Sequence, residues 1–297
     1  MRKLPAALAF LFAFTLAAHA ASFEEAAALY DDKDYKNALS IAAPLADAGD
    51  MRAMAMLGTI YEKGLGVKAD LDKAIAWYTR AAGAGHVASQ FALGMLYLDG
   101  SLGGIDYEKG ASWVSKAAEA GNAEAQFNMG LLNSGAFNSQ PDWAEAYKWY
   151  AMAAERGFAD AQYNLGVLYL EGRGVDKDQV QAASWFAKAA AQGNANAALD
   201  YGVLVFRGEG VQKDEAIGAK WMLISARHGN VVAQNRVARL YAYGKGVAQD
   251  PIEAMKWNIL ATNGGRPDAE LDTLFQQLTP EQKAEAGARA EAFKPEK

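Results

Sequence analysis

The 297-residue sequence contains no cysteine and only three histidines. The missing cysteine excludes disulfides, thiolate metal ligands, a cysteine nucleophile and a lipid-anchored N-terminal cysteine. His86 and His228 lie far apart in the sequence, and no pair of histidines has the spacing of a metal-binding helix. No G-x-S-x-G motif occurs either. The sequence therefore predicts no catalytic residue, no metal site and no cofactor, and we do not expect an enzyme.

Positive charge is also in short supply. Lysine and arginine number 29 against 35 aspartate and glutamate residues, which gives a net charge of −6. No run of basic residues stands out after the N-terminus. Nucleic acid and anionic membrane surfaces are therefore poor partner candidates.

Long apolar runs are absent except at the N-terminus. Arg2 and Lys3 precede the 15-residue run "LPAALAFLFAFTLAA", which is followed by His19 and Ala20. A membrane-spanning helix needs about 20 residues, whereas a basic start, a short apolar run and an A-x-A site are typical of a secretory signal peptide. The sequence predicts that residues 1–20 are a signal peptide cleaved after Ala20, so the protein is periplasmic or secreted.

The rest of the sequence repeats with a period of 36 residues. The period is kept by a tryptophan, by an aspartate seven residues before it and by a glycine eight residues after it. The tryptophans are Trp77, Trp113, Trp149, Trp185, Trp221 and Trp257, and the aspartates are Asp70, Asp106, Asp142, Asp178, Asp214 and Asp250. A fixed period of this length indicates an array in which each repeat packs against its neighbours.

Each period predicts two helices. The first has an apolar stripe at helical spacing, formed in one repeat by Ala161, Leu165, Leu168 and Tyr169. The stripe of the second is formed by Ala182, Trp185, Phe186, Ala189 and Ala190. The aspartate before the second helix is its expected N-cap, and the tryptophan row is expected to be the core between the helices.

The segment Gly172-Arg173-Gly174 looks at first like a phosphate-binding loop. Similar glycine pairs recur at 64, 208 and 244, each between the two helices of a repeat. A nucleotide loop is needed once per nucleotide, whereas a structural turn recurs with its repeat. We therefore predict that these glycines are the joints of helical hairpins, with the first in the left-handed conformation that ends a helix.

The stretch "LGTIYEKGLGVKADLDKAIAWYTRAAGAG" resembles the Sel-one-like repeat, a relative of the tetratricopeptide repeat. The resemblance implies an all-α fold, a right-handed α/α solenoid of 36-residue helical hairpins. Together, the N-terminal pattern, the 36-residue period and the helix-capping residues at the C-terminal end divide the chain into a signal peptide (1–20), a degenerate N-terminal repeat (21–49), six repeats (50–265), and a capping helix with its tail (266–297). Asn133, Val205 and Gly218 depart from the repeat pattern.

In tetratricopeptide relatives, residues of the first helices that avoid the core line a concave groove. By this resemblance, the central repeats contribute apolar groove positions that are expected to bind a partner: Phe91, Met95, Leu98, Phe127, Leu131, Tyr163, Val167, Leu170 and Phe206. Thr59, Glu62 and Arg239 mark polar ends. The row of Phe91, Phe127 and Tyr163 could instead pack against neighbouring helices and loops.

The resemblance implies a protein–protein interaction scaffold or regulator without catalysis of its own. The alternative is binding of a cell-wall peptide, or an enzyme-like activity as in penicillin-binding relatives that carry a cysteine pair in each repeat. The missing cysteines count against the latter. Trp143 is the one tryptophan outside the period, and it is either an exposed anchor for a partner or a plug for an irregular loop. The sequence does not indicate an oligomeric state.

Overall fold

The computed structural model describes residues 22–135 and 140–296. In these ranges the chain forms sixteen α-helices and no strand, so the all-α prediction is confirmed. The helices belong to two compact units, one up to Leu93 and one from Gly94 onward. The predicted signal peptide and the residue Ala21 lie outside the described residues.

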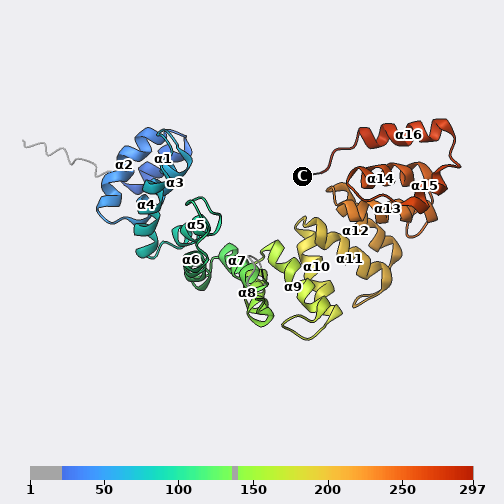
Figure 1. Cartoon of the computed structure of the whole chain (residues 1–297), viewed down its shortest axis with the longest axis horizontal. Helices are drawn as coiled ribbons and strands as arrows, with labels where there is room; N and C mark the ends of the chain where they lie inside the picture. The colour runs from blue at the N-terminus through green and yellow to red at the C-terminus, as the bar shows by residue number, and fades with distance from the viewer. Residues whose placement is uncertain (1–21, 136–139, 297) are drawn as a thin grey trace, which may run out of the picture. The chain divides into compact units, whose positions relative to one another are not determined.

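The first unit contains two hairpins and the start of a third. Its helices are α1 (Phe23–Asp31), α2 (Tyr35–Asp47), α3 (Met51–Lys63), α4 (Leu71–Gly83) and the first part of α5 (Val87–Leu98). Helices α1 and α2 lie in the segment predicted to be a degenerate repeat, and each packs against the next helix along the chain (Figure 1).

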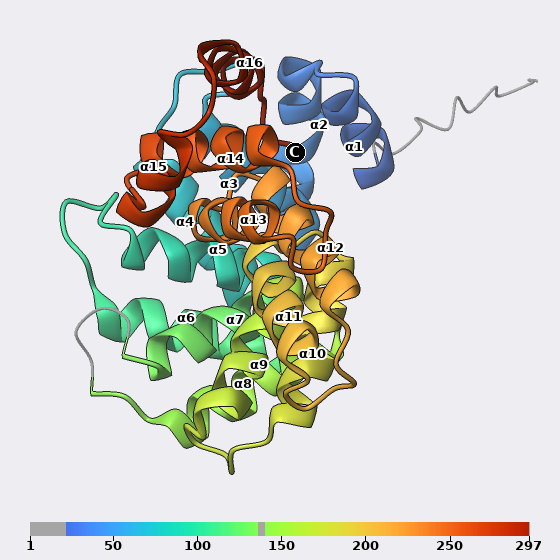
Figure 2. The same cartoon turned by 90° about the vertical axis from the view of Figure 1, so that its right-hand side faces the viewer.

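The second unit continues α5 and contains the remaining helices. They are α6 (Tyr107–Glu119), α7 (Ala123–Asn133), α8 (Trp143–Glu155), α9 (Ala159–Glu171), α10 (Gln179–Ala191), α11 (Ala195–Arg207), α12 (Glu215–Arg227), α13 (Val231–Tyr243), α14 (Pro251–Asn263), α15 (Ala269–Phe275) and α16 (Pro280–Glu291). Figure 2 shows α16 beyond α14, against which it packs.

The periodic aspartates start the second helix of every repeat. In each of the six, the carboxylate accepts a hydrogen bond from a backbone N–H in the first turn, as Asp178 does from Gln181 at 3.0 Å. Thr279 and Gln282 form the predicted capping box of α16. These side chains satisfy N–H groups that the helix itself leaves unpaired.

The glycine pairs are joints between helices, as predicted. Gly172 ends α9 at φ 73°, and Gly174 has φ 70°. A Cβ atom on Gly174 would lie 2.0 Å from the backbone oxygen of Trp143, the first residue of α8. The second glycine of the pair thus lets the loop touch the preceding repeat, and no phosphate-binding role is needed to explain it.

The tryptophans of the first five repeats are not the fully buried core residues that the sequence predicted. Trp185 is half-buried, whereas its neighbour Phe186 is fully buried and lies against Gly166 of the first helix. The same holds for the residues that follow the tryptophans in the other early repeats: Tyr78, Val114, Tyr150 and Met222. The ammonium group of Lys188 lies over the half-buried Trp185 ring, 3.6 Å from the ring centroid.

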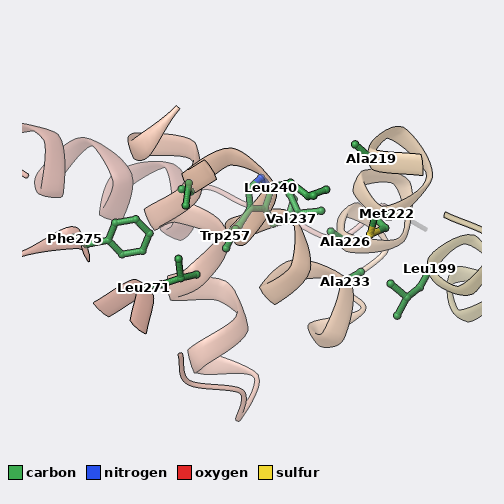
Figure 3. Packing of buried hydrophobic residues seen from close by; sticks show 13 residues of the cluster. Leu199, Ala219, Met222, Ala226, Ala233, Val237, Leu240, Trp257, Leu271 and Phe275 are labelled. Atoms are coloured by element: carbon green, nitrogen blue, oxygen red, sulfur yellow. The ribbon is translucent and has the colours of Figure 1, made fainter. Parts of the chain in front are cut away.

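The last repeat is different, because Trp257 is itself buried. Leu271 and Phe275 of α15 belong to the same core cluster as Trp257, as Figure 3 shows. Phe293 after α16 packs edge-on to the Trp257 ring, with centroids 5.4 Å apart. The C-terminal segment therefore covers the core that a further repeat would otherwise bury. The capping helix was predicted from the sequence, but α15 was not.

Candidate functional site

Two residues of the first row of predicted groove positions pack mainly against other aromatic rings of their own repeats. The Phe127 ring lies 5.1 Å from that of Phe158 and 5.9 Å from that of Tyr150. The Tyr163 ring lies 5.6 Å from that of Phe186, and its hydroxyl donates a hydrogen bond to Asp200. Phe91 is half-buried in the first unit. These contacts favour the packing interpretation for Phe127 and Tyr163.

The prediction that Leu98 lines the partner-binding groove is wrong. It is buried, and a Cβ atom on Gly110 of α6 would lie 2.6 Å from its Cγ. The side chain therefore fills the space above a glycine in the core and offers no surface to a partner. Periodicity alone could not show this, because Leu98 is the last residue of α5 and its direction depends on how α6 crosses.

The other predicted groove residues keep part of their surface accessible. Met95, Leu131, Val167, Leu170 and Phe206 are half-buried. Val167 and Leu170 of α9 pack at the edge of one core cluster, and Phe206 of α11 packs at the edge of the next. The first helices of the second unit thus present a stripe of partly accessible apolar side chains.

Two connected depressions lie at the C-terminal part of this stripe. The smaller, of about 200 Å³, is lined by Val203, Phe206, Arg207, Met222, Arg236, Arg239 and Leu240. The larger, of about 600 Å³, is lined by Phe206, Arg239, Leu240, Tyr243, Lys245 and Glu270. They share Phe206, Arg239 and Leu240, so they form one continuous surface between α11, α13 and the start of α15.

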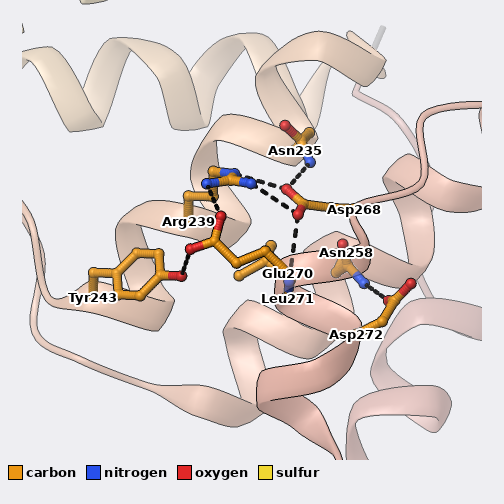
Figure 4. Close-up of polar contacts among 8 residues, drawn as sticks. All are labelled: Asn235, Arg239, Tyr243, Asn258, Asp268, Glu270, Leu271 and Asp272. Atoms are coloured by element: carbon orange, nitrogen blue, oxygen red, sulfur yellow. Dashed lines mark hydrogen bonds and ion pairs between the residues drawn. The ribbon is translucent and has the colours of Figure 1, made fainter.

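Arg239 is fixed in this surface by two carboxylates. Its guanidinium donates to both oxygens of Asp268, at 2.7 and 2.8 Å, and to Glu270 at 3.0 Å (Figure 4). Asp268 also accepts from Asn235, and the Tyr243 hydroxyl donates to Glu270. Burial alone would raise the pKa of Asp268, but the hydrogen bonds from Arg239 and Asn235 outweigh it and hold that pKa below its usual value.

Arg236 lines the same depression without such partners. Within the described residues its guanidinium has no hydrogen bond and no ion pair. Burial lowers the pKa of Arg236 from its usual value, and the charge of Arg207 lowers it further, while the charge of Asp200 acts in the opposite direction. Arg207 itself has only a long contact to Glu209, 3.6 Å between Nη1 and Oε1.

Arg236 is not among the groove positions predicted from the sequence, although its spacing along the helix could have indicated it. Arg236, Arg239 and Tyr243 follow the i, i+3, i+7 spacing of one helical face. Only Arg239 was singled out, as a polar end of the groove. In the structure, Asp268 and Glu270 at the start of α15 neutralise Arg239, a pairing that the sequence does not predict. Among the described residues, Arg236 makes no such ion pair.

The first unit has a depression of its own, of about 540 Å³. Its lining includes Phe23, Arg52, Met56, Thr59 and Tyr78. The Tyr78 hydroxyl donates to Glu62 and lies 3.0 Å from the Thr59 hydroxyl. Arg52 is bound to Glu24 and Asp50 at 3.0 and 3.1 Å. The polar residues predicted for this end are thus mutually satisfied.

The described residues contain no group of three or more histidine, aspartate or glutamate side chains that could hold a metal ion. His86 has a structural role, because its Nδ1 accepts a hydrogen bond from the backbone N–H of Ser89 at 3.2 Å in the first turn of α5.

Trp143 is half-buried and packs against a core cluster, with the guanidinium of Arg173 at 4.8 Å from its ring centroid. This contact favours the plug interpretation of Trp143 over the anchor. Across the part of the chain that the structure describes, no helix combines the length and apolarity needed to span a membrane.

Comparisons with known proteins agree with the repeat. A family profile described as "Sel1 repeat" matches six consecutive segments: 52–86, 87–122, 123–158, 159–194, 195–230 and 231–265. The chain is similar to a solved Sel1 repeat protein from Oxalobacter formigenes, with 33% identity, a TM-score of 0.69, and coverage of 82% of this chain and all of the other. It is also similar to a protective antigen with an SLR fold from uropathogenic Escherichia coli, with 26% identity, a TM-score of 0.57, and coverage of 92% and 68%. Comparison with the curated proteins gives no match.

Proposed function

Because the chain belongs to the Sel1 repeat family, whose members are generally protein–protein interaction scaffolds, we propose that it is an exported scaffold or regulator that binds a partner peptide along the first helices of the second unit. It has no catalysis of its own in this proposal. One observation supports it most: half-buried apolar side chains recur at equivalent positions of α7, α9 and α11 and lead into the depressions at Phe206.

Such a stripe suits an extended or helical peptide. Repeated apolar positions can each hold one side chain of the partner, while the polar groups around Arg239 and Glu270 form a rim. A few anchors then supply most of the binding free energy, and Leu131, Leu170 and Phe206 are the candidates.

The groove proposal is tested by charged substitution. Leu131→Glu and Leu170→Glu place a carboxylate in the half-buried stripe, so we expect capture of the partner from the cell envelope to fall at least about tenfold, corresponding to about 1.4 kcal/mol. Capture is measured by quantitative mass spectrometry with the mature protein as bait. Val180→Glu is the matched control, because Val180 is 61% exposed on a second helix. Since Leu131 and Leu170 are half-buried, circular dichroism and thermal melting must show that the variants are folded; folded variants with undiminished capture contradict the groove.

The export proposal rests on Arg2, Lys3 and the apolar run that follows them. We expect the mature protein to begin at Ala21 or Ser22, because the A-x-A site ends at Ala20. Intact-mass measurement of protein isolated from the periplasm or the medium checks this. A mature mass that still includes Arg2 and Lys3 would rule out cleavage at this site.

A further inference from the structure

The smaller depression of the second unit combines cations with an apolar wall. Val203, Phe206, Met222 and Leu240 supply the wall, and three arginines supply the cations. A volume of about 200 Å³ is enough for one or two side chains of a ligand. An apolar ligand alone would leave the guanidinium groups without partners, and a bare anion would leave the wall unfilled.

The three arginines differ in how far they are already neutralised. Arg239 is held by Asp268 and Glu270, so its charge is used within the protein. Arg207 is 57% exposed and has one long contact to Glu209. Arg236 has no partner among the described residues, and the nearby charges of Arg207 and Arg266 disfavour its own. An anion placed beside Arg236 and Arg207 would relieve this repulsion.

Among the residues that the structure describes, no carboxylate fulfils that role. Asp200 influences Arg236 electrostatically, but it accepts a hydrogen bond from Tyr163 and makes no ion pair with Arg236. Burial raises the pKa of Asp200 above its usual value, which weakens it further as a counter-ion. The lining of the smaller depression contains three arginines and no acidic residue, although the protein as a whole is acidic.

Side chains outside the smaller depression extend the site. In the preceding repeat, the half-buried Val167 and Leu170 of α9 belong to the apolar stripe and pack against the cluster that contains Leu204 of α11. The adjoining larger depression adds Tyr243 and Lys245. A ligand chain can therefore pass through the site instead of ending in it.

We propose that this depression recognises an acidic segment of a partner protein, in which an aspartate or glutamate side chain binds Arg236 and Arg207 while a neighbouring apolar side chain packs on Phe206 and Leu240. The proposal rests on the proposed partner-binding function and specifies the chemistry of the partner. Guanidinium groups suit carboxylates because they offer several N–H donors in a planar fork.

The test is a selection with the mature full-length protein. The probe is a library of 12-residue peptides displayed between constant flanking segments, so that none has a free C-terminus. We expect enrichment of peptides with an acidic residue next to leucine, isoleucine, methionine or phenylalanine. The best peptide is then synthesised with both ends capped, and its affinity is measured by fluorescence anisotropy at two salt concentrations, with weaker binding expected at higher salt.

The variants separate a specific contact from general charge. Arg236→Gln should weaken binding at least about tenfold, because a hydrogen bond to a charged group is lost. Replacing the acidic residue of the peptide by its amide should cause a similar loss, and combining both changes should add little. Arg236→Lys should lie between. Lys220→Gln is the matched control, since it removes one exposed positive charge on α12 outside both depressions.

Three results would overturn the proposal. They are selected peptides without an acidic preference, equal affinity for the Arg236→Gln variant, and binders that come only from a second library with free C-termini. If envelope capture depends on Leu131 and Leu170 while any of these results is found, the proposed function stands and the acidic specificity falls. If acidic peptides bind through Arg236 but the Leu131→Glu and Leu170→Glu variants capture the envelope partner as well as the wild type does, the proposed groove is contradicted instead.

Discussion

In the first five repeats, each periodic tryptophan is followed by a residue that is more deeply buried than the tryptophan itself. Both side chains lie on the broad apolar face of the second helix. Only the following residue meets the glycine of the first helix, as Phe186 meets Gly166 at a would-be Cβ distance of 2.7 Å. The tryptophan is left at the boundary, where a basic side chain covers its ring in several repeats.

This difference gives a prediction for neighbouring residues. Phe186→Ala should lower the free energy of unfolding by about 3–5 kcal/mol, because it leaves a cavity in a fully buried position. Trp185→Ala should cost less than about 3 kcal/mol, since part of its ring is already in water. Chemical denaturation followed by circular dichroism gives both values. A larger loss for Trp185→Ala would restore the tryptophan as the core residue.

At the scale of the helix, the sequence was most informative where one side chain acts on its own helix. The aspartate caps, the capping box of Thr279 and the hinge at Gly172 follow from local backbone chemistry, and all are present. Which of Trp185 and Phe186 points inward was not predictable, because a period of 3.6 places both on one face and only the partner helix distinguishes them.

The candidate site was less predictable than the fold. Arg239 is paired with Asp268, which lies 29 residues later at the start of a seven-residue helix that has no equivalent in the repeats. The 36-residue period predicts neither the ion pair of Arg239 with Asp268 nor that Arg236 makes no ion pair among the described residues. Leu98 was misplaced for the same reason, since its contact with Gly110 depends on the crossing of two helices.

Helix α5 supplies a prediction on pH. The Nδ1 atom of His86 must be unprotonated to accept the N–H of Ser89. Burial lowers the pKa of His86 from its usual 6.5, although Asp50 acts in the opposite direction. The unfolded chain therefore binds a proton more readily than the folded chain. Stability from this group is present above pH 6.5 and is lost as the pH falls through the lowered folded value.

We expect the unfolding free energy of the wild-type protein to decrease between pH 7.5 and pH 5.5 by more than that of His86→Asn. Asparagine is a good N-cap that does not titrate, so it keeps the hydrogen bond over the whole range. Urea denaturation at the two pH values measures the difference. Parallel pH dependences for the two proteins would show that His86 does not contribute through this proton.

At the scale of the whole molecule, most contacts join helices that are neighbours in the sequence. In the second unit, α11 packs on α12, α12 on α13, and α13 on α14, and the same order holds for α1 to α4 in the first. Stability in such an array is close to a sum of repeat terms and nearest-neighbour terms. A local defect should therefore have local consequences.

Hydrogen exchange read out by mass spectrometry tests this. In the Phe186→Ala variant, α9 to α12 should exchange faster, whereas protection of α2 and α3 in the first unit should stay close to that of the wild type. The half-buried Trp185→Ala variant serves as a comparison with a smaller change in the same helices. A uniform loss of protection in both units would mean that the chain unfolds as a single cooperative block.

The second glycine of each joint touches the start of a helix in the preceding repeat: Gly66 at Tyr35, Gly174 at Trp143, Gly210 at Gln179 and Gly246 at Glu215. Each 36-residue segment with such a joint thus encodes both the surface it offers to its successor and the loop that fits its predecessor. A tandem duplication of one such segment in the gene would insert a copy whose two junctions already match. The array can therefore lengthen or shorten by whole repeats during evolution, while the end-covering helices α15 and α16 need to be present only once.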